Sequence, residues 1–198
     1  GERELRAGRW SGWHPMHHLG RRLSGKTLGV VGMGRIGRAV ARRAVHGFGM
    51  RLLYASRTEL PAGEAAALDA VHVEMDRVFA ESDVVSLHVP SSGETRHLVD
   101  ARRLELMPPH GILINTSRGD VVDEGALVDA LARGVIAGAG LDVYAEEPRV
   151  HPGLLALQNV VLLPHLGSAT VESRIAMGMR AFENLVAIAT ANYAAPRE

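Results

Sequence analysis

The feature that most constrains the fold is a glycine-rich stretch at residues 28–37, with the sequence LGVVGMGRIG. An apolar run ends in three glycines with the spacing G-x-G-x-x-G, and a helical pattern follows. This order of strand, turn and helix is typical of dinucleotide-binding folds. Gly32 can adopt the angles of a tight turn, Gly34 leaves room for a pyrophosphate, and Gly37 lets the helix pack closely. The helix N-terminus would face the phosphates. The stretch predicts a dinucleotide site, with an ordinary βα turn as the alternative.

The rest of the chain alternates candidate strands with candidate helices. Short apolar runs predict strands at 27–31, 51–55, 71–73, 84–89, 111–115, 136–141 and 159–163. Periodic patterns predict helices at 35–48, 76–81, 100–106, 123–133 and 170–190. Alternation of this kind is typical of βαβ units. We therefore expect an α/β fold of Rossmann type, with a doubly wound parallel sheet and helices on both faces in a single domain.

Length and composition limit the domain organisation and the partners. The 198 residues, 46% of them hydrophobic, can bury a sizeable core in one domain. We expect the end of an interdomain helix and an irregular arm at 1–22, the Rossmann domain at 23–190 and a tail at 191–198. The 22 basic residues balance the 22 acidic residues, which favours neither nucleic acid nor an anionic membrane as a partner. Cysteine is absent, which excludes disulfides and is compatible with the cytoplasm. No apolar run approaches the length of a membrane span.

Two tryptophans and three histidines gather between residues 10 and 18. A metal or ligand site is one interpretation of this group. However, Pro15 interrupts any regular ligand spacing, and no Cys, Asp or Glu joins the group along the sequence. We therefore expect a covering or interface segment and predict no metal site.

The predicted strand ends group residues that are far apart in the sequence. Ligands of a parallel sheet bind outside the carboxyl ends of its strands. The residues at or just past these ends are Gly32, Ser56, Pro90, Thr116, Asp142 and His165. We expect them to line a single crevice.

The loop after the second strand, Ser56-Arg57-Thr58, bears on the choice of cofactor. An NAD-specific site has an acid near this position for the ribose 2′-hydroxyl, but this chain has none before Glu59. Two hydroxyls and a guanidinium suit a 2′-phosphate instead. The loop predicts a preference for NADP(H), with NAD(H) as the second choice. The alternative is that Arg57 is only a solvated loop charge.

Three residues carry the catalytic hypothesis: Arg118, Glu147 and His165. Arginine can hold a carboxylate by two parallel hydrogen bonds. Histidine exchanges protons near neutral pH, and a neighbouring carboxylate stabilises its charged form. Reduction of a 2-keto acid needs such a carboxylate anchor and proton donor. Taken singly, the three residues could equally be a surface loop charge, a turn residue and a capping residue.

Several motifs in fixed order resemble those of one enzyme family. They are LSGKT at 23–27, LHVP at 87–90, TRHL at 95–98, NTSRG at 115–119, GLDVY at 140–144, EP at 147–148 and PHLGSAT at 164–170. Over nearly its whole length, the chain resembles the nucleotide-binding domain of the D-isomer-specific 2-hydroxyacid dehydrogenases. Within that family it is most similar to the glyoxylate/hydroxypyruvate reductases. Formate dehydrogenases of the family carry Gln where this chain has Glu147, so that activity is not expected.

The resemblance implies a role for each motif residue. Arg118 would bind the substrate carboxylate, His165 would be the acid/base, and Glu147 would pair with His165. Asp142 would bond the nicotinamide carboxamide. The other candidate cofactor-binding residues are Gly32, Gly34, Arg35, Ile36, Gly37, Ser56, Arg57, Thr58, Val89, Pro90, Thr95, Thr116, Ser117, Gly167 and Ser168. The loop at 56–58 resembles that of the NADP-using glyoxylate reductases.

The resemblance also implies a larger protein. Family members have a substrate-binding domain built mainly from residues that precede the nucleotide-binding domain, and they dimerise through a helical arm. We expect both to be missing here, so that the chain alone binds cofactor better than it turns over. The whole protein would be a homodimer that transfers hydride between NADP(H) and glyoxylate or hydroxypyruvate. The alternatives are a nucleotide-sensing, corepressor-like module without turnover and a purely structural Rossmann domain.

Overall fold

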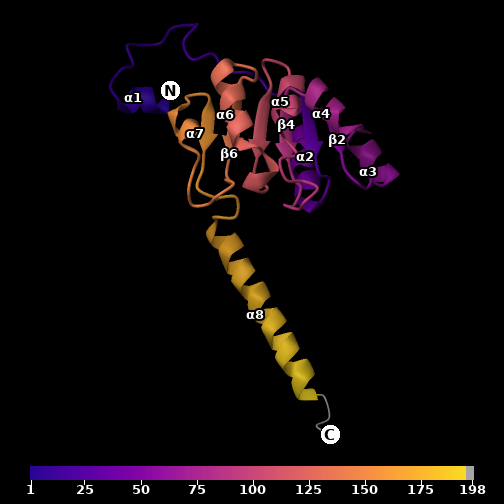
Figure 1. Ribbon diagram of the computed structural model, residues 1–198. Coiled ribbons are helices and arrows are strands. Elements are labelled where there is room, and N and C mark those ends of the chain that lie inside the picture. The colour runs from indigo at the N-terminus through magenta and orange to yellow at the C-terminus, as the bar shows by residue number, and fades with distance from the viewer. Residues whose placement is uncertain (195–198) are drawn as a thin grey trace.

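The computed structural model describes residues 1–194, with side chains through residue 190, and is built on one parallel sheet (Figure 1). Its seven strands lie in the order β3-β2-β1-β4-β5-β6-β7. They span Thr27–Val31 (β1), Arg51–Ala55 (β2), Ala70–His72 (β3), Val84–Leu87 (β4), Ile112–Asn115 (β5), Gly138–Leu141 (β6) and Val160–Leu162 (β7). The strand order reverses at β1, whose two neighbours are β2 and β4. This is the Rossmann arrangement, in which ligands bind at the reversal point, and it confirms the predicted fold class.

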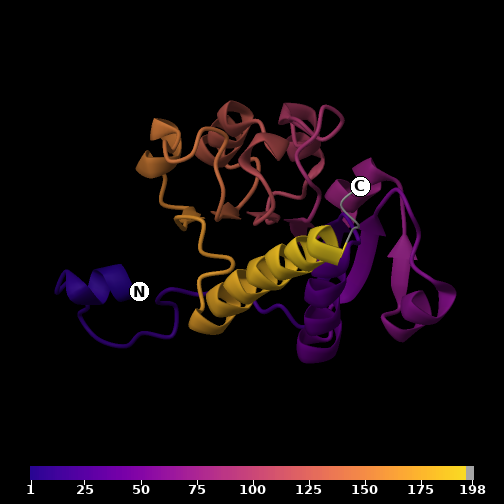
Figure 2. The ribbon, with the colours of Figure 1, turned by 90° about the horizontal axis from the view of Figure 1, so that it is seen from below.

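Helices cover both faces of the sheet. The helices of the described chain are α1 (Glu2–Arg6), α2 (Arg35–Phe48), α3 (Ala62–Ala67), α4 (Met75–Glu81), α5 (Ala101–Leu106), α6 (Glu124–Arg133), α7 (Pro152–Ala156) and α8 (Val171–Ala194), with a 3-10 turn at Gly119–Val121, and of these α1 and α8 do not pack on the sheet. Figure 2 shows α2 below the sheet and α6 and α7 above it. The doubly wound layering predicted from the alternation is therefore present.

Each face of the sheet has its own apolar core. On one face, Phe79 of α4, Leu127 of α6 and Leu113 of β5 are fully buried in one apolar cluster. On the other face, Ala41 of α2 packs with Val30 of β1. Burial on both faces explains why the central strands read as nearly continuous apolar runs.

The helix at 124–133 shows how local sequence sets the element bounds. The carboxylate of Asp123 accepts a hydrogen bond from the N–H of Ala126 at 3.0 Å and so caps the helix start. Gly134 ends the helix in the left-handed conformation, with φ of 71°. Both capping residues agree with the sequence prediction.

Several predicted bounds were wrong. The strand predicted at 84–89 ends at Leu87, because Pro90 has no N–H to extend the ladder. The last helix runs on to Ala194, so residues 191–194 of the predicted tail are helical and 195–198 lie outside the described residues. The alanines of 187–194 favour helix, which explains the extension. The short helices α3 and α7 and the 3-10 turn were not predicted. Each is too short for a helical periodicity of apolar residues to be visible in the sequence.

Helix α8 leads away from the sheet as a single long helix (Figure 1). Large apolar side chains along it, among them Ile175, Phe182 and Leu185, are exposed. Within the described part of the chain, no helix combines the length and the apolar character needed to cross a bilayer.

Candidate active site

The glycines of the β1–α2 turn fit the requirements of a phosphate-binding turn. Gly32 has φ of 93°, and a Cβ there would lie 2.7 Å from the carbonyl oxygen of His88. A Cβ on Gly37 would lie 2.2 Å from the carbonyl oxygen of Gly32, so any side chain would push the helix off the strand. A Cβ on Gly34 would meet nothing within 4 Å. Packing within the chain would therefore tolerate a side chain at residue 34. The open space beside Gly34 suits an approaching ligand.

The first turn of α2 fits an anionic group. Gly34 is the N-cap residue and makes no side-chain capping bond, and the first turn contains no acid. Arg35 and Ile36, the first two helical residues, are exposed. The free N–H groups and the dipole of a 14-residue helix favour a phosphate at this end. This turn therefore fits the pyrophosphate of a dinucleotide.

The loop after β2 presents Arg57 to solvent. The N–H of Leu60 donates to the hydroxyl of Tyr54 at 2.9 Å, which folds the loop back onto the sheet. The nearest acid in the sequence, Glu59, lies 3.3 Å from Nδ1 of His72. Within the described residues, no hydrogen bond or ion pair holds the Arg57 guanidinium. Arg57 is therefore available to a ligand, as are the exposed Thr58 and the half-buried Ser56.

The loop after β4 lies against the glycine turn. The Val89 side chain packs against the turn at Gly32. The Thr95 hydroxyl donates to the carbonyl of Pro90 at 2.6 Å and accepts from the N–H of Ser92 at 2.8 Å. Thr95 thus shapes the loop that carries Pro90.

Asn115 organises the loop after β5, and sequence analysis missed it. Its amide is buried, with 1% exposure, and donates to the carbonyl of Arg118 at 2.8 Å. Its oxygen accepts from the N–H and the hydroxyl of Ser117, at 3.0 and 2.8 Å. The Ser117 hydroxyl is therefore used inside the protein, while Thr116 is exposed. The sequence did contain a signal for this role, because an asparagine at the end of an apolar strand commonly bonds to the backbone of the following turn.

Glu147 and His165 form a pair at the carboxyl ends of β6 and β7. One Glu147 oxygen lies 2.9 Å from Nδ1 of His165, and the other accepts from the N–H of Tyr144 at 3.1 Å. The hydrogen bond from His165 is the main cause that lowers the pKa of Glu147, and the charge of Arg118 contributes. Because Glu147 is an ionised acceptor, Nδ1 of His165 carries the donated hydrogen and Nε2 is left for a substrate.

Apolar side chains flank this pair. A hollow of about 310 Å³ adjoins Glu147 and His165, and its walls include Tyr144, Leu155 and Leu163. The His165 and Glu147 side chains are nevertheless 50% and 37% exposed, so solvent screens the attraction between them.

Asp142 fixes the loop that begins at His165. Its side chain is buried, with 4% exposure, and its two oxygens accept from the N–H groups of Leu166 and Gly167 at 2.6 and 2.7 Å. His165 itself has φ of 55°, a conformation that surrounding contacts must maintain. The predicted cofactor residues Gly167 and Ser168 lie on this same loop. Asp142 therefore positions the histidine, in addition to the cofactor role predicted for it.

The sheet brings most of the predicted residues to one edge. Arg118, Asp142 and His165 follow the neighbouring strands β5, β6 and β7. The glycine turn follows β1, and Ser56 follows β2 on its other side. The roles of the individual residues stay predictions.

Residues 1–167 match the family model described as D-isomer specific 2-hydroxyacid dehydrogenase, NAD binding domain. The chain belongs to this family. The resemblance noted in the sequence is confirmed.

Curated members of the 2-hydroxyacid dehydrogenase family are similar over most of this chain. The glyoxylate reductase of Thermococcus litoralis is 52% identical over 189 residues, which are 93% of this chain and 56% of that protein. The glyoxylate reductase of Pyrococcus furiosus is 50% identical over 191 residues, with 94% and 56% covered. The chain thus spans about half the length of the curated relatives it matches.

Solved structures of the family have the same fold. An NADPH-dependent glyoxylate/hydroxypyruvate reductase from Sinorhizobium meliloti, in complex with NADP and malonate, superposes with a TM-score of 0.85 at 42% identity. The match covers 94% of this chain and 57% of that chain. A D-isomer specific 2-hydroxyacid dehydrogenase from Polaromonas gives a TM-score of 0.91 at 39% identity, with 96% and 59% covered.

Proposed function

We propose that the whole protein containing this chain transfers hydride between NADP(H) and a small 2-keto or 2-hydroxy acid such as glyoxylate or hydroxypyruvate. The observation that carries the proposal is the Glu147–His165 pair, whose atoms lie 2.9 Å apart. The charge of Arg118 is close enough to lower the pKa of Glu147. The glyoxylate reductases that cover this chain at about 50% identity support the substrate class.

Each of these side chains has a distinct task in the proposed reaction. When bound, the dinucleotide supplies the hydride. Arg118 holds the substrate carboxylate through its guanidinium fork. His165 gives the proton at Nε2 to the carbonyl oxygen, while Glu147 keeps the ring oriented through Nδ1. In the direction of oxidation, the same Nε2 accepts the hydroxyl proton.

The preference for NADP(H) rests on the loop at 56–58. Arg57 is exposed, and its guanidinium is suited to a 2′-phosphate. The solved Sinorhizobium meliloti relative is NADPH-dependent, which supports the same choice for this chain.

Titration of the chain with NADPH and with NADH tests the cofactor choice. We expect NADPH to bind more tightly, and an Arg57→Ala change to weaken NADPH binding by roughly tenfold or more, because a hydrogen bond to a charged group contributes about 1.5–3 kcal/mol. NADH binding should be unchanged. Arg43→Ala removes an exposed arginine from the middle of α2 and is the matched control. Equal or tighter binding of NADH would reject the preference.

Glyoxylate-dependent oxidation of NADPH by the whole protein tests the activity. We expect His165→Ala to lower kcat by roughly 10²–10⁴-fold, the usual contribution of a general acid or base. Arg118→Ala should mainly raise KM. His110→Ala is the control. His110 precedes β5 and so lies at the opposite end of the strands from His165, and its ring pairs with Asp83 at 2.9 Å. Full activity in the His165 or Arg118 variant would reject the role of that residue. Cofactor binding without turnover would favour a nucleotide-sensing module, and no dinucleotide binding would favour a structural domain.

We also propose that the whole protein is a cytoplasmic homodimer. Sedimentation of the whole protein measures the oligomeric state, and a monomeric mass would contradict the proposal. Fractionation of the source cells tests the compartment.

A further inference from the structure

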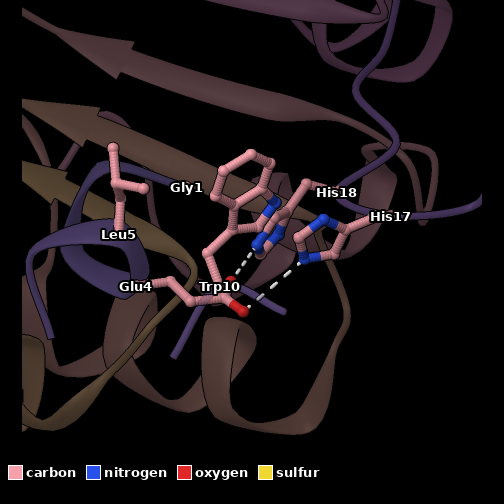
Figure 3. Close-up of a pocket in the computed structure, with 6 residues that line it drawn as sticks. All are labelled: Gly1, Glu4, Leu5, Trp10, His17 and His18. Carbon is pink, nitrogen blue, oxygen red and sulfur yellow. Dashed lines mark hydrogen bonds and ion pairs between the residues drawn. The ribbon is translucent and has the colours of Figure 1, made fainter. Parts of the chain in front are cut away.

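A cluster of three side chains near the N-terminus has no part in the proposed reaction (Figure 3). One donor atom from each of Glu4, His17 and His18 lies within 4.8 Å of the others. Nε2 of His17 is 3.5 Å from one Glu4 oxygen, and Nε2 of His18 contacts the other oxygen. No acid joins these histidines along the sequence, so the sequence interpretation did not include Glu4. The chain turns back after α1, which brings Glu4 to the rings.

The backbone aims the two adjacent rings in one direction. Neighbouring side chains of an extended chain point to opposite sides. His18 instead has φ of 50°, and the N–H of His17 donates to the carbonyl of His14 at 3.0 Å in the preceding turn. The two ring centroids are consequently 4.0 Å apart. This arrangement presents both Nε2 atoms to the same carboxylate.

Open space adjoins the three donors. A hollow of about 300 Å³ is lined by Gly1, Glu4, Leu5, Trp10, His17 and His18. Figure 3 shows the Trp10 indole beside the two imidazoles, with the Glu4 carboxylate facing them. The Glu4 and His17 side chains are 27% and 33% exposed, so they are partly shielded yet reachable from solvent.

We propose that Glu4, His17 and His18 form a binding site for one divalent transition-metal ion, best suited to Zn²⁺. Two imidazole nitrogens and one carboxylate oxygen suit zinc and its neighbours, whereas Mg²⁺ and Ca²⁺ prefer oxygen donors alone. With bonds of about 2.0–2.2 Å, ligands of a tetrahedral zinc ion lie roughly 3.3–3.5 Å apart. The distance from Nε2 of His17 to its Glu4 oxygen has this length, at 3.5 Å, whereas Nε2 of His18 is hydrogen-bonded to the other Glu4 oxygen and would have to part from it to bind the ion.

The hollow leaves room for water to complete the coordination of the ion. Because Glu4 belongs to α1 and the histidines to the irregular segment after it, the ion would cross-link the two. The site is separate from the proposed reaction and does not rest on it.

Calorimetric titration of the tag-free, chelator-treated chain with Zn²⁺ tests the site. We expect one equivalent to bind, and Glu4→Gln, His17→Ala and His18→Ala each to weaken binding by at least about tenfold, since even loss of an outer-shell partner costs that much. His46→Ala removes an exposed imidazole from α2 and should leave the affinity unchanged. Far-UV circular dichroism of each variant checks the fold.

Cobalt provides a second readout that a hydrogen-bonded ion pair alone would not give. The wild-type chain loaded with one equivalent of Co²⁺ should show the visible absorption of a site with nitrogen and oxygen ligands, and Glu4→Gln should weaken that spectrum. Two results would overturn the proposal. One is the lack of saturable one-equivalent binding by the wild-type chain, and the other is equal zinc affinity in wild type and Glu4→Gln. In either case, the cluster is only an ion pair.

Discussion

Replacing Asp142 by asparagine isolates the contacts that hold the histidine loop. In the wild type, two main-chain N–H groups donate to one buried carboxylate, at 2.6 and 2.7 Å. Each such bond to a charged group contributes about 1.5–3 kcal/mol, and a neutral one about 1 kcal/mol. Asparagine keeps one acceptor and turns an amide donor toward the other N–H. The loop should therefore lose at least about 2 kcal/mol, or roughly 30-fold in its opening equilibrium.

Amide hydrogen exchange measures this opening directly, because exchange of a protected N–H requires local opening. In the cofactor-free chain, the N–H groups of Leu166 and Gly167 should exchange roughly 30-fold faster in Asp142→Asn than in the wild type. Glu146→Gln is the matched control, since that exposed acid pairs only with Arg149 among the described residues. Equal protection of the two amides in Asp142→Asn and wild type would refute the positioning role of the carboxylate.

Four further substitutions test the same structure. Glu147 is ionised near neutral pH, and the lowering of its pKa keeps it ionised at more acidic pH as well. Replacing this charged partner of His165 in Glu147→Gln should cut kcat by about 10²-fold in glyoxylate-dependent NADPH oxidation by the whole protein; unchanged kcat contradicts its role. Gly37→Ala places a Cβ 2.2 Å from a carbonyl oxygen and should cost about 2 kcal/mol, or roughly 4–8 °C in Tm. Gly34→Ala should instead leave Tm unchanged and weaken dinucleotide binding; a similar Tm loss in both variants would contradict the packing argument. The hydrogen bond from Arg102 is the main cause that lowers the pKa of Asp76 from 3.8 to about 2. The ion pair of Asp76 with Arg102 thus contributes fully to the stability of the fold above the ordinary pKa of Asp76. That contribution is lost as the pH falls through about 2. Asp76→Asn should lower Tm near neutral pH but not near pH 2, and an equal loss at both would count against the ion pair.

The hydrogen-bonding side chains at the strand ends show where sequence patterns stop being informative. Asn115 is the last residue of β5 and Asp142 directly follows β6, and their side chains accept hydrogen bonds from N–H groups of a following loop. For Asn115 the partner is Ser117, two residues on, and a local turn could have been predicted. For Asp142 the partner Leu166 is 24 residues on, across the β6–β7 crossover. The register of two strands sets that contact, and no local pattern encodes it.

The sequence by itself determined the layered fold and the edge of the sheet where ligands bind. Residues 28–37 and the alternation of apolar runs are local patterns, formed by residues that are neighbours along the chain. The fold class can therefore be predicted from them without the tertiary structure. Only the tertiary structure decided which atoms meet. It set Glu147 against His165 and brought Glu4 to His17 and His18, because hydrogen bonds and ion pairs form over about 3 Å, a separation that chain folding alone fixes.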